Sequence, residues 1–512
     1  MSVVHPACLL LPLLYACTGD KGPVVTDDTS DTADTSDTTD TSDTPADLAV
    51  GDVTDMATTA DGSVSISVTE PGTYLVALVS LATDNDTKFK YASRYDGSAS
   101  QEATPSAPFP ATPARPVRPA MAVAPGDERT FSVYDGSSYQ TITALATNVT
   151  DSVILWEDQT TPNGFGELDR ETVDGVLSLF DSPVLPRERQ VFGDESDVDG
   201  DGKVSVLLSY TVNEYGAVAY VQWGDIGVGS GVDSANGGEI IYLGIPDPTS
   251  HYSTDYGIEE TVAHEFNHLI YAWHKLAEND QPLAQENPYI TEGTSALAQD
   301  LTGYNNGNQY VWGAALDMSE MYGDDAMSIQ SASINDVMRG AGGYDSNRDG
   351  VLRGTSYLFL RYLFEQAGGF TVESDGSFTD NGGIAWIHSF FDSPALGPDA
   401  VEETTGRSFD DVVMDWYTAI MVTGRVDNSN PAWNYQERVV DPITGYSFGM
   451  DPFANLYGIQ LTGPFVQDWD AADGRIYAGG VEYLQVTITE ATTLTMPVDP
   501  AAMARARVLR VE

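Results

Sequence analysis

The chain has 512 residues, of which 41% are hydrophobic and 10% aromatic, so it holds enough apolar material for two or three domains with their own cores. Its 77 acidic and 23 basic residues give a formal net charge of −54 at pH 7. This charge argues against binding to a nucleic-acid backbone or an anionic membrane face, and it is typical of the solubilising surface of a secreted protein.

The first 17 residues form an apolar run that is too short to span a bilayer and indicates an export signal. The run ends in Leu14-Tyr-Ala-Cys17, which resembles the bacterial lipobox, whose cysteine is lipidated. Thr18, rather than Asp, follows this cysteine and favours the outer membrane. The only other cysteine is Cys8, so a mature chain would have no disulfide framework and no cysteine nucleophile. We expect a cell-envelope lipoprotein anchored through Cys17, with no other membrane segment.

Residues 18–47 consist almost entirely of Thr, Asp and Ser and predict a disordered tether, because a like-charged polar tract cannot bury a core. Residues 48–150 alternate apolar and polar side chains, as in Ser63-Val-Ser-Ile-Ser-Val68, and predict a β-sandwich-like domain. Whether this domain is a removable pro-segment stays open.

Residues 151–428 mix helical periodicity with short strands, and residues 429–512 return to a strand-like pattern, most clearly in Tyr483-Leu-Gln-Val-Thr-Ile488. We therefore predict an α+β fold in which a central domain at 151–428 is flanked by N-terminal and C-terminal β-rich modules.

The segment from Ile258 to His274 has the apolar spacing of a half-buried helix. His264 and His268 are four residues apart, so they lie on one face of that helix, and Glu265 is adjacent. Two neutral imidazoles in this arrangement bind one Zn²⁺ ion, and the glutamate accepts a proton from water, which is the His-Glu-x-x-His signature of zinc peptidases. The alternative is a helical pair of structural histidines.

A catalytic zinc ion needs a third protein ligand. Glu292 opens a second helix-like stretch after His268 and would complete a His₂Glu site. His274 has the offset of the third histidine in metzincins, but Tyr271 stands where those proteins have a helix-breaking glycine. A continuous helix would place His274 about 15 Å along the axis from His264. We favour Glu292 and keep His274 as the metzincin alternative, to which the Met-turn-like Ser319-Glu-Met-Tyr322 also points.

Five further segments follow one another in a recognisable order. They are Asp199-Gly-Asp-Gly-Lys-Val-Ser-Val-Leu-Leu208, Gly216-Ala-Val-Ala-Tyr220, Thr261-Val-Ala-His-Glu-Phe-Asn-His-Leu-Ile270, Thr291-Glu-Gly293 and Gly354-Thr-Ser-Tyr-Leu-Phe-Leu-Arg-Tyr-Leu363. In this order the chain resembles the hyicolysin-type metallopeptidases over roughly residues 190–425. The resemblance implies a zincin-like catalytic domain of the gluzincin type, with Glu292 as the third zinc ligand.

The chain departs from the gluzincin pattern at two places. Ala296 stands where many gluzincins have an aspartate that orients a zinc histidine. Arg353 precedes Gly354 where family members tend to have a tyrosine that donates to the transition state. Tyr357 is our candidate for that donor, with Tyr344 and His388 as alternatives.

Two acidic segments have the alternating oxygen ligands and late glycine of calcium loops. The first contains Asp197, Asp199 and Asp201, and the second contains Asp345, Asn347 and Asp349. Neither has a bidentate glutamate at the twelfth position, where Leu208 and Ser356 stand. Each segment is either a structural Ca²⁺ site or an acidic turn.

The predicted activity is zinc-dependent endopeptidase cleavage of extracellular proteins or peptides, with Glu265 as general base. An extended substrate would add to the edge of a strand at Ala217–Val221, although that strand reads equally well as sheet core. The rival from another class is a non-catalytic surface lipoprotein that uses a peptidase fold for binding. Hydrolysis of a non-peptide bond is a third possibility. Composition and motifs leave the oligomeric state open.

Overall fold

The structure is a computed structural model of the chain. It describes residues 46–82, 88–92, 122–160, 174–175, 177–178, 180–228, 234–245, 255–279, 281, 286, 288–303, 346–445, 447–456, 459–477 and 479–512. The predicted signal segment with Cys17, and the tether apart from its last two residues, lie outside these ranges. Within them, no helix is both long and apolar enough to cross a membrane.

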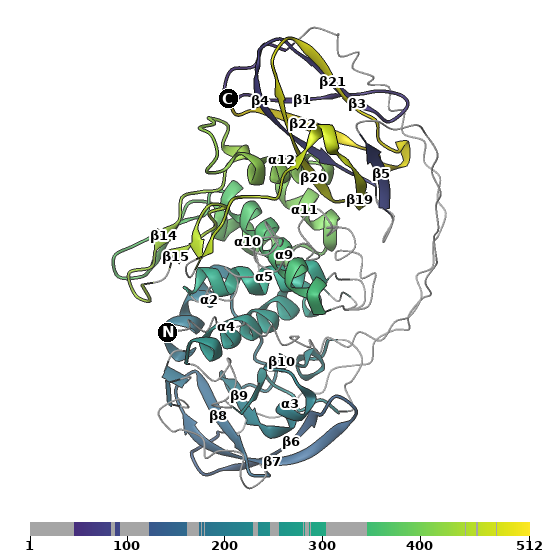
Figure 1. Ribbon diagram of the computed structural model, residues 1–512. Coiled ribbons are helices and arrows are strands. Elements are labelled where there is room, and N and C mark those ends of the chain that lie inside the picture. Colours follow the sequence, from purple (N-terminus) through teal and green to yellow (C-terminus); the bar gives the residue numbers. More distant parts are fainter. Residues whose placement is uncertain are drawn as a thin grey trace, which may run out of the picture. The chain divides into compact units, whose positions relative to one another are not determined.

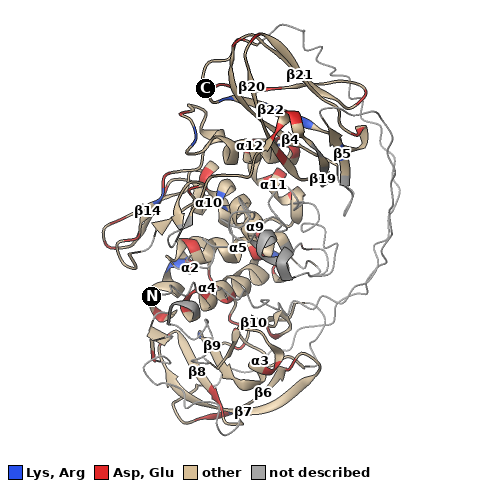
Figure 2. Cartoon of the chain, in the orientation of Figure 1, with Lys and Arg blue, Asp and Glu red and all other residues tan. Residues whose placement is uncertain are grey.

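The chain mixes helices and sheets, so the predicted α+β class is confirmed. It divides into two compact units, one built mainly on Thr112–Leu283 and the other mainly on Asp20–Ala111 and Gly350–Glu512. Acidic side chains far outnumber basic ones along both (Figure 2).

The first unit contains a six-stranded mixed sheet in the order β10-β11-β9-β8-β7-β6. Its central strands β8, β9 and β11 run parallel and are almost wholly buried, as expected for strands covered on both faces. Among the described strands β10 pairs only with β11, so it forms an edge of the sheet. The strands are β6 (Glu128–Tyr134), β7 (Tyr139–Val149), β8 (Val153–Asp158), β9 (Val204–Ser209), β10 (Ala219–Val221) and β11 (Ile240–Gly244).

Helical segments pack around this sheet, and α4 (Asp255–Tyr271) is the longest of them (Figure 1). It contacts strands β10 and β11 and also the helical segments η1 (Phe180–Val184) and α2 (Leu185–Phe192). From Val262 onward every residue of α4 is buried, whereas the sequence pattern predicted a half-buried helix. A helix that packs against a sheet and against other helices has no face left for water. The remaining helical segments of this unit are α3 (Tyr210–Tyr215), η2 (Trp223–Ile226) and η5 (Ala272–Ala277).

The second unit brings the two ends of the described chain into one β module. The five-stranded sheet has the order β1-β22-β4-β20-β18, and β21 pairs with β3. In Figure 1 the purple N-terminal strands and the yellow C-terminal strands therefore alternate. The strands are β1 (Val53–Asp55), β2 (Ala57–Thr58), β3 (Val64–Val68), β4 (Gly72–Val79), β5 (Lys88–Ala92), β18 (Gln467–Asp468), β19 (Asp473–Tyr477), β20 (Val481–Ile488), β21 (Thr492–Met496) and β22 (Arg505–Arg510).

This pairing differs from the predicted domains at 48–150, 151–428 and 429–512. β6 and β7, predicted in the N-terminal module, belong with β8 to the sheet of the first unit, while β3, β4 and β5 share one core with the C-terminal strands. Boundaries drawn from composition failed here because strand alternation shows that a strand has a buried face but does not specify its partner.

Helices make up much of the remaining described part of the second unit. They are α5 (Pro288–Leu301), α9 (Ser346–Gln366), α10 (Gly383–Asp392), α11 (Gly397–Thr405) and α12 (Phe409–Val422). α12 contacts β4 and β22, and Arg507 of β22 forms a buried ion pair with Asp415 of α12. The β module and the helices therefore share an interior. Short segments complete this unit: η8 (Pro431–Trp433), η9 (Trp469–Ala471), η10 (Pro500–Ala502), β12 (Phe370–Val372), β13 (Phe378–Asp380), β14 (Val439–Val440), β15 (Ser447–Phe448), β16 (Asn455–Leu456) and β17 (Ile459–Gln460).

Candidate metal centre

Helix α4 carries the predicted histidine pair and the predicted base. His264, Glu265 and His268 are 4%, 3% and 1% exposed, so all three are held in the interior. The two imidazole rings lie 4.8 Å apart, centroid to centroid, at an interplanar angle of 83°. The i, i+4 spacing thus places both rings on one face of the helix, as the sequence predicted.

Packing on either side of these residues fixes how α4 is rotated about its axis. The ring of Phe266 meets Phe180 of η1 edge to face, with 5.1 Å between centroids. The ring of His268 lies 6.3 Å from that of Trp223 in η2. Because an aromatic residue anchors α4 between the two histidines, a rotation that moved the imidazoles would also break a buried aromatic pair.

Glu292 lies in the first turns of α5, and the residue after it explains how closely α5 approaches α9. A Cβ atom on Gly293 would lie 2.9 Å from Cδ2 of Leu360 and 3.0 Å from the backbone oxygen of Ser356. Any larger residue would force the two helices apart. The Tyr289 hydroxyl also donates to the Thr355 carbonyl at 3.0 Å. The glycine of Thr291-Glu-Gly therefore has a packing role beside the candidate ligand.

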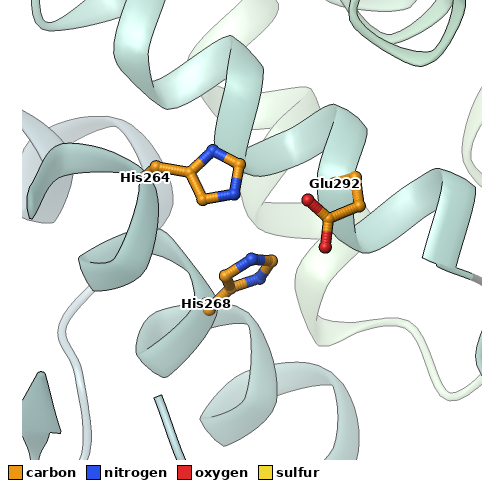
Figure 3. Close-up of side chains that lie close together, drawn as sticks. All are labelled: His264, His268 and Glu292. Atoms are coloured by element: carbon orange, nitrogen blue, oxygen red, sulfur yellow. The ribbon is translucent and has the colours of Figure 1, made fainter. Parts of the chain in front are cut away.

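His264, His268 and Glu292 each offer one ligand atom, and these atoms lie within 4.8 Å of one another. Figure 3 shows the two imidazoles and the carboxylate facing a common space. Ligands held at about 2.0–2.1 Å from one zinc ion in tetrahedral geometry are roughly 3.4 Å apart, so only small side-chain adjustments separate this arrangement from such a site. Two imidazoles and one carboxylate are a donor set of catalytic zinc sites, so the residues fit the ion.

His274, the metzincin alternative, lies in η5, which continues the helix beyond α4. One of its ring nitrogens, Nε2, is 2.8 Å from the backbone oxygen of Asp194, and the other, Nδ1, is 3.3 Å from Glu278 Oε2. Both ring nitrogens thus have partners outside the His264–His268 pair. The helix continues after Tyr271, so the chain does not turn back to carry His274 toward that pair.

Tyr357, the predicted oxyanion donor, is fully buried in α9 and its hydroxyl donates to Asp300 at 2.8 Å. Arg361 also donates to Asp300 at 2.8 Å and to Glu365 at 2.5 Å, and the Gly449 amide donates to Asp300 at 3.1 Å. Burial raises the pKa of Tyr357 well above its usual range. Because its hydroxyl already donates to Asp300, the structure does not show Tyr357 available to a reacting oxygen, and its catalytic role stays a prediction.

Sequence reasoning missed Asp300, which ties α5 to α9 through this network. A carboxylate eight residues after Glu292 lies about two turns further along the same helix, and that spacing was the only available signal. Of the other donor candidates, Tyr344 lies outside the described residues, as does the Ser319–Tyr322 segment. His388 is on α10.

The first predicted calcium segment lies between α2 and β9. Asp197 and Asp199 form a second cluster of potential metal ligands, and the third member is Glu239, just before β11. Asp201 is next to them, and burial, then the charge of Asp199, raises its pKa to about 6. Burial likewise raises the pKa of Glu239 to about 8. Glu239 was not predicted as a ligand, because in sequence it reads as the start of a strand.

The second predicted calcium segment has a different backbone. Asp345 lies outside the described residues, whereas Asn347 and Asp349 are in the first turns of α9, which begins at Ser346. The prediction of a calcium-binding loop is therefore wrong for residues 346–350, which are helical. Calcium loops need successive turns that bring alternate residues to one point, and a regular helix does not provide them.

Comparisons with known proteins find no matching family model and no matching curated protein. Among solved structures, the chain is similar to an M1 zinc metallopeptidase from Deinococcus radiodurans, with 15% identity and a TM-score of 0.29 over 57% of this chain and 51% of that chain. It thus spans about half the length of that protein. A mutant of an M1 zinc metallopeptidase from the same organism, bound to a Tyr-Ser-Ala substrate, matches at 14% identity and a TM-score of 0.29 over 72% and 90%. Similarity at this level leaves the assignment of function to the geometry of the site.

Proposed function

We propose that the protein is a zinc-dependent peptidase whose metal is bound by His264, His268 and Glu292. The observation that carries this proposal is the convergence of two imidazoles and one carboxylate within 4.8 Å. A structural histidine pair would not need a carboxylate from a second helix at the same point. Three protein ligands leave a fourth position for water, as a catalytic zinc site requires.

A zinc ion bound there would supply Lewis-acid activation of a water molecule and of the scissile carbonyl. Glu265 is the adjacent carboxylate on α4 and, in this proposal, accepts the proton of the attacking water and then transfers it to the leaving amine nitrogen. Its 3% exposure supports this role, because exclusion of bulk water strengthens the interaction between the carboxylate and a bound reactant.

Strand β10 is a suitable surface for an extended peptide. It is an edge strand of the six-stranded sheet, and it contacts α4, which carries His264 and His268. An unpaired strand edge offers backbone N–H and C=O groups to a peptide, which binds by adding one more strand. We propose that substrate binds along β10, so peptide hydrolysis is favoured over hydrolysis of a non-peptide bond.

Endopeptidase action on extracellular proteins and lipid anchoring through Cys17 are finer parts of this proposal. The hyicolysin-type resemblance supports the first, and the lipobox-like Leu14-Tyr-Ala-Cys17 supports the second. Metabolic labelling with a palmitate analogue tests the anchor, with Cys17→Ser as the unlabelled control. A label retained in Cys17→Ser would refute lipidation at this residue.

The decisive experiment measures zinc content and hydrolysis on the same purified protein. We expect one zinc ion per chain, cleavage of casein, loss of both after treatment with a zinc chelator, and recovery after zinc is restored. Internally quenched peptides with blocked termini then separate endopeptidase from exopeptidase action, because only an endopeptidase cleaves them. Stoichiometric zinc without hydrolysis, or no zinc, would instead favour a binding module on a peptidase fold.

A further inference from the structure

The loop that precedes β9 folds so that its acidic side chains accept hydrogen bonds from backbone amides of the same loop. The Gly202 amide donates to Asp197 at 3.0 Å, the Asp201 amide donates to Asp199 at 3.3 Å, and the Lys203 amide donates to Asp201 at 2.8 Å. These bonds give the loop its shape but do not neutralise the charge of three carboxylates within five residues.

A fourth carboxylate enters from another part of the chain. Glu239 is only 2% exposed, and one of its oxygens lies within 4.8 Å of oxygens of Asp197 and Asp199. Its Oε1 atom accepts hydrogen bonds from the Ser196 hydroxyl and, at 3.1 Å, from the Val198 amide. Its Oε2 atom is buried and accepts no hydrogen bond from any residue that the structure describes. Burial of a carboxylate oxygen with no hydrogen-bond donor destabilises the folded state unless a cation or a proton binds it.

The backbone just before Glu239 leaves room for the Asp199 carboxylate. Gly238 has a φ angle of +123°, and a Cβ atom there would lie 2.7 Å from Oδ2 of Asp199. Only glycine therefore lets the Asp199 carboxylate lie against the chain immediately before Glu239. The Asp225 carboxylate accepts from the Asn236 and Gly237 amides and so holds the same turn from the other direction.

The charges of Arg129 and Lys203 act on Asp199 and Asp201, but neither basic side chain forms a described ion pair with the cluster. In the described part of the chain, none of Asp197, Asp199, Asp201 and Glu239 forms an ion pair. The amine of Lys203 instead donates to the backbone oxygens of Thr150 and Asp151, at 2.5 and 2.7 Å. Three carboxylates thus converge, with Asp201 beside them, and no described ion pair neutralises them.

We infer that Asp197, Asp199 and Glu239, with Asp201 beside them, form a Ca²⁺ site separate from the zinc site. The donors are all oxygen atoms, which suits a hard cation, and Ca²⁺ accepts six to eight of them in irregular arrangements. Glu239 supplies in space the carboxylate that the loop lacks at its twelfth position, where Leu208 stands. Water and backbone oxygens complete the coordination.

This calcium ion is a structural one. It ties the loop that leads into β9 to the residue that leads into β11, and these two strands pair in parallel from Ser205 and Ile240 onward. The Ser205 amide already donates to the Glu239 backbone oxygen at 2.7 Å. β11 in turn contacts α4. Calcium would therefore stabilise the sheet on which the helix with His264 and His268 packs.

Calcium titration of the full chain tests the inference. After removal of divalent ions with EGTA and reloading of zinc, calorimetry with CaCl₂ should detect one site with a Kd of about 10⁻⁶–10⁻³ M. Saturating calcium should raise the Tm of the zinc-loaded, calcium-free protein by roughly 3–8 °C. Asp197→Asn and Glu239→Gln should each weaken binding by about tenfold or more. MgCl₂ in place of CaCl₂ should give weaker binding, because Mg²⁺ demands octahedral geometry.

Two controls keep the result specific. Glu214→Gln removes an exposed carboxylate of α3 in the same unit and should bind calcium as the wild type does. His264→Ala should lose zinc and keep calcium, so failure of the proposed peptidase function would leave this test intact. Asp197 is exposed, so Asp197→Asn is expected to fold even where Glu239→Gln does not. No calcium binding by the wild type, or unchanged binding in Asp197→Asn and in folded Glu239→Gln, would overturn the inference.

Discussion

The histidine cluster on α4 and the acidic cluster before β9 place metal ligands by different means. On α4 a regular helix sets the spacing of His264 and His268, and both side chains are buried in a packed interior. In the acidic cluster an irregular loop presents Asp197 and Asp199, and the buried ligand, Glu239, comes from a distant turn. The helix imposes rigid geometry with nitrogen donors, which suits zinc, whereas the loop provides adaptable oxygen donors, which suit calcium.

This difference shows what each cluster can do. The histidine cluster has a neighbouring carboxylate, Glu265, which we propose as the base, so a metal bound there would be placed for catalysis. The acidic cluster contains only ligands and lies where two strands of a central sheet begin, so its metal would serve stability. The following predictions test this division, in order of expected size.

The largest effect is expected for Glu265→Gln. Removal of the proposed general base should lower kcat by about 10³-fold or more, because general acid–base catalysis contributes on this scale. Zinc content should stay at the wild-type level, since Glu265 is not a ligand in the proposed site. Casein hydrolysis and elemental analysis of the same sample check both points, and a variant with more than a tenth of wild-type activity would contradict the assignment.

Glu292→Ala should abolish tight zinc binding, with activity falling by about 10²-fold or more at limiting zinc. His274→Ala is the matched control, because its ring nitrogens contact Asp194 and Glu278 rather than the cluster. Zinc affinity is measured by competition with a chromophoric chelator. Loss of zinc from His274→Ala instead of Glu292→Ala would make the metzincin alternative correct.

Asp300→Asn should lower the free energy of unfolding by about 2 kcal/mol, because it removes a buried charge that accepts from Tyr357 and Arg361. Tyr357→Phe removes only the hydroxyl and should cost about 1 kcal/mol with kcat nearly unchanged. Urea unfolding and steady-state kinetics are measured on both. A Tyr357→Phe variant of wild-type stability whose kcat falls 10²-fold would instead make Tyr357 the oxyanion donor.

The smallest effect concerns Glu188 of α2, a buried carboxylate that belongs to no ligand cluster in the described chain. Neither of its oxygens accepts a hydrogen bond from a described residue, and burial raises its pKa well above 4.5. The folded state thus retains a proton that the unfolded state releases, so stability falls as pH rises above 4.5. Glu188→Gln should reduce this loss. Tm values at pH 5 and pH 8 measure it, and identical pH dependence in both proteins would refute it.

Local periodicity accounts for the predicted placement of His264 and His268 on one face of a helix, which the structure shows. The i, i+4 spacing of His264 and His268 and the apolar residues around them require only a helix, and α4 is that helix. The continued helix after Tyr271 follows from the same local preference. Pairing of distant segments accounts for the errors: the β modules predicted at 48–150 and 429–512 share sheets, and β6 and β7 belong to the sheet of the first unit.

The amino-acid sequence by itself determined the overall charge, the α+β class, the histidine pair with its adjacent glutamate, and the acidic loop at 197–202. Each depends on residues within a few positions of one another, whose geometry a helix or turn sets. Only the tertiary structure decided that β1, β3, β4 and β5 pair with the C-terminal strands, that Asp300 anchors Tyr357, and that Glu239 joins Asp197 and Asp199. These contacts join segments far apart in the chain, and burial of apolar surface in the whole fold selects them over the alternatives.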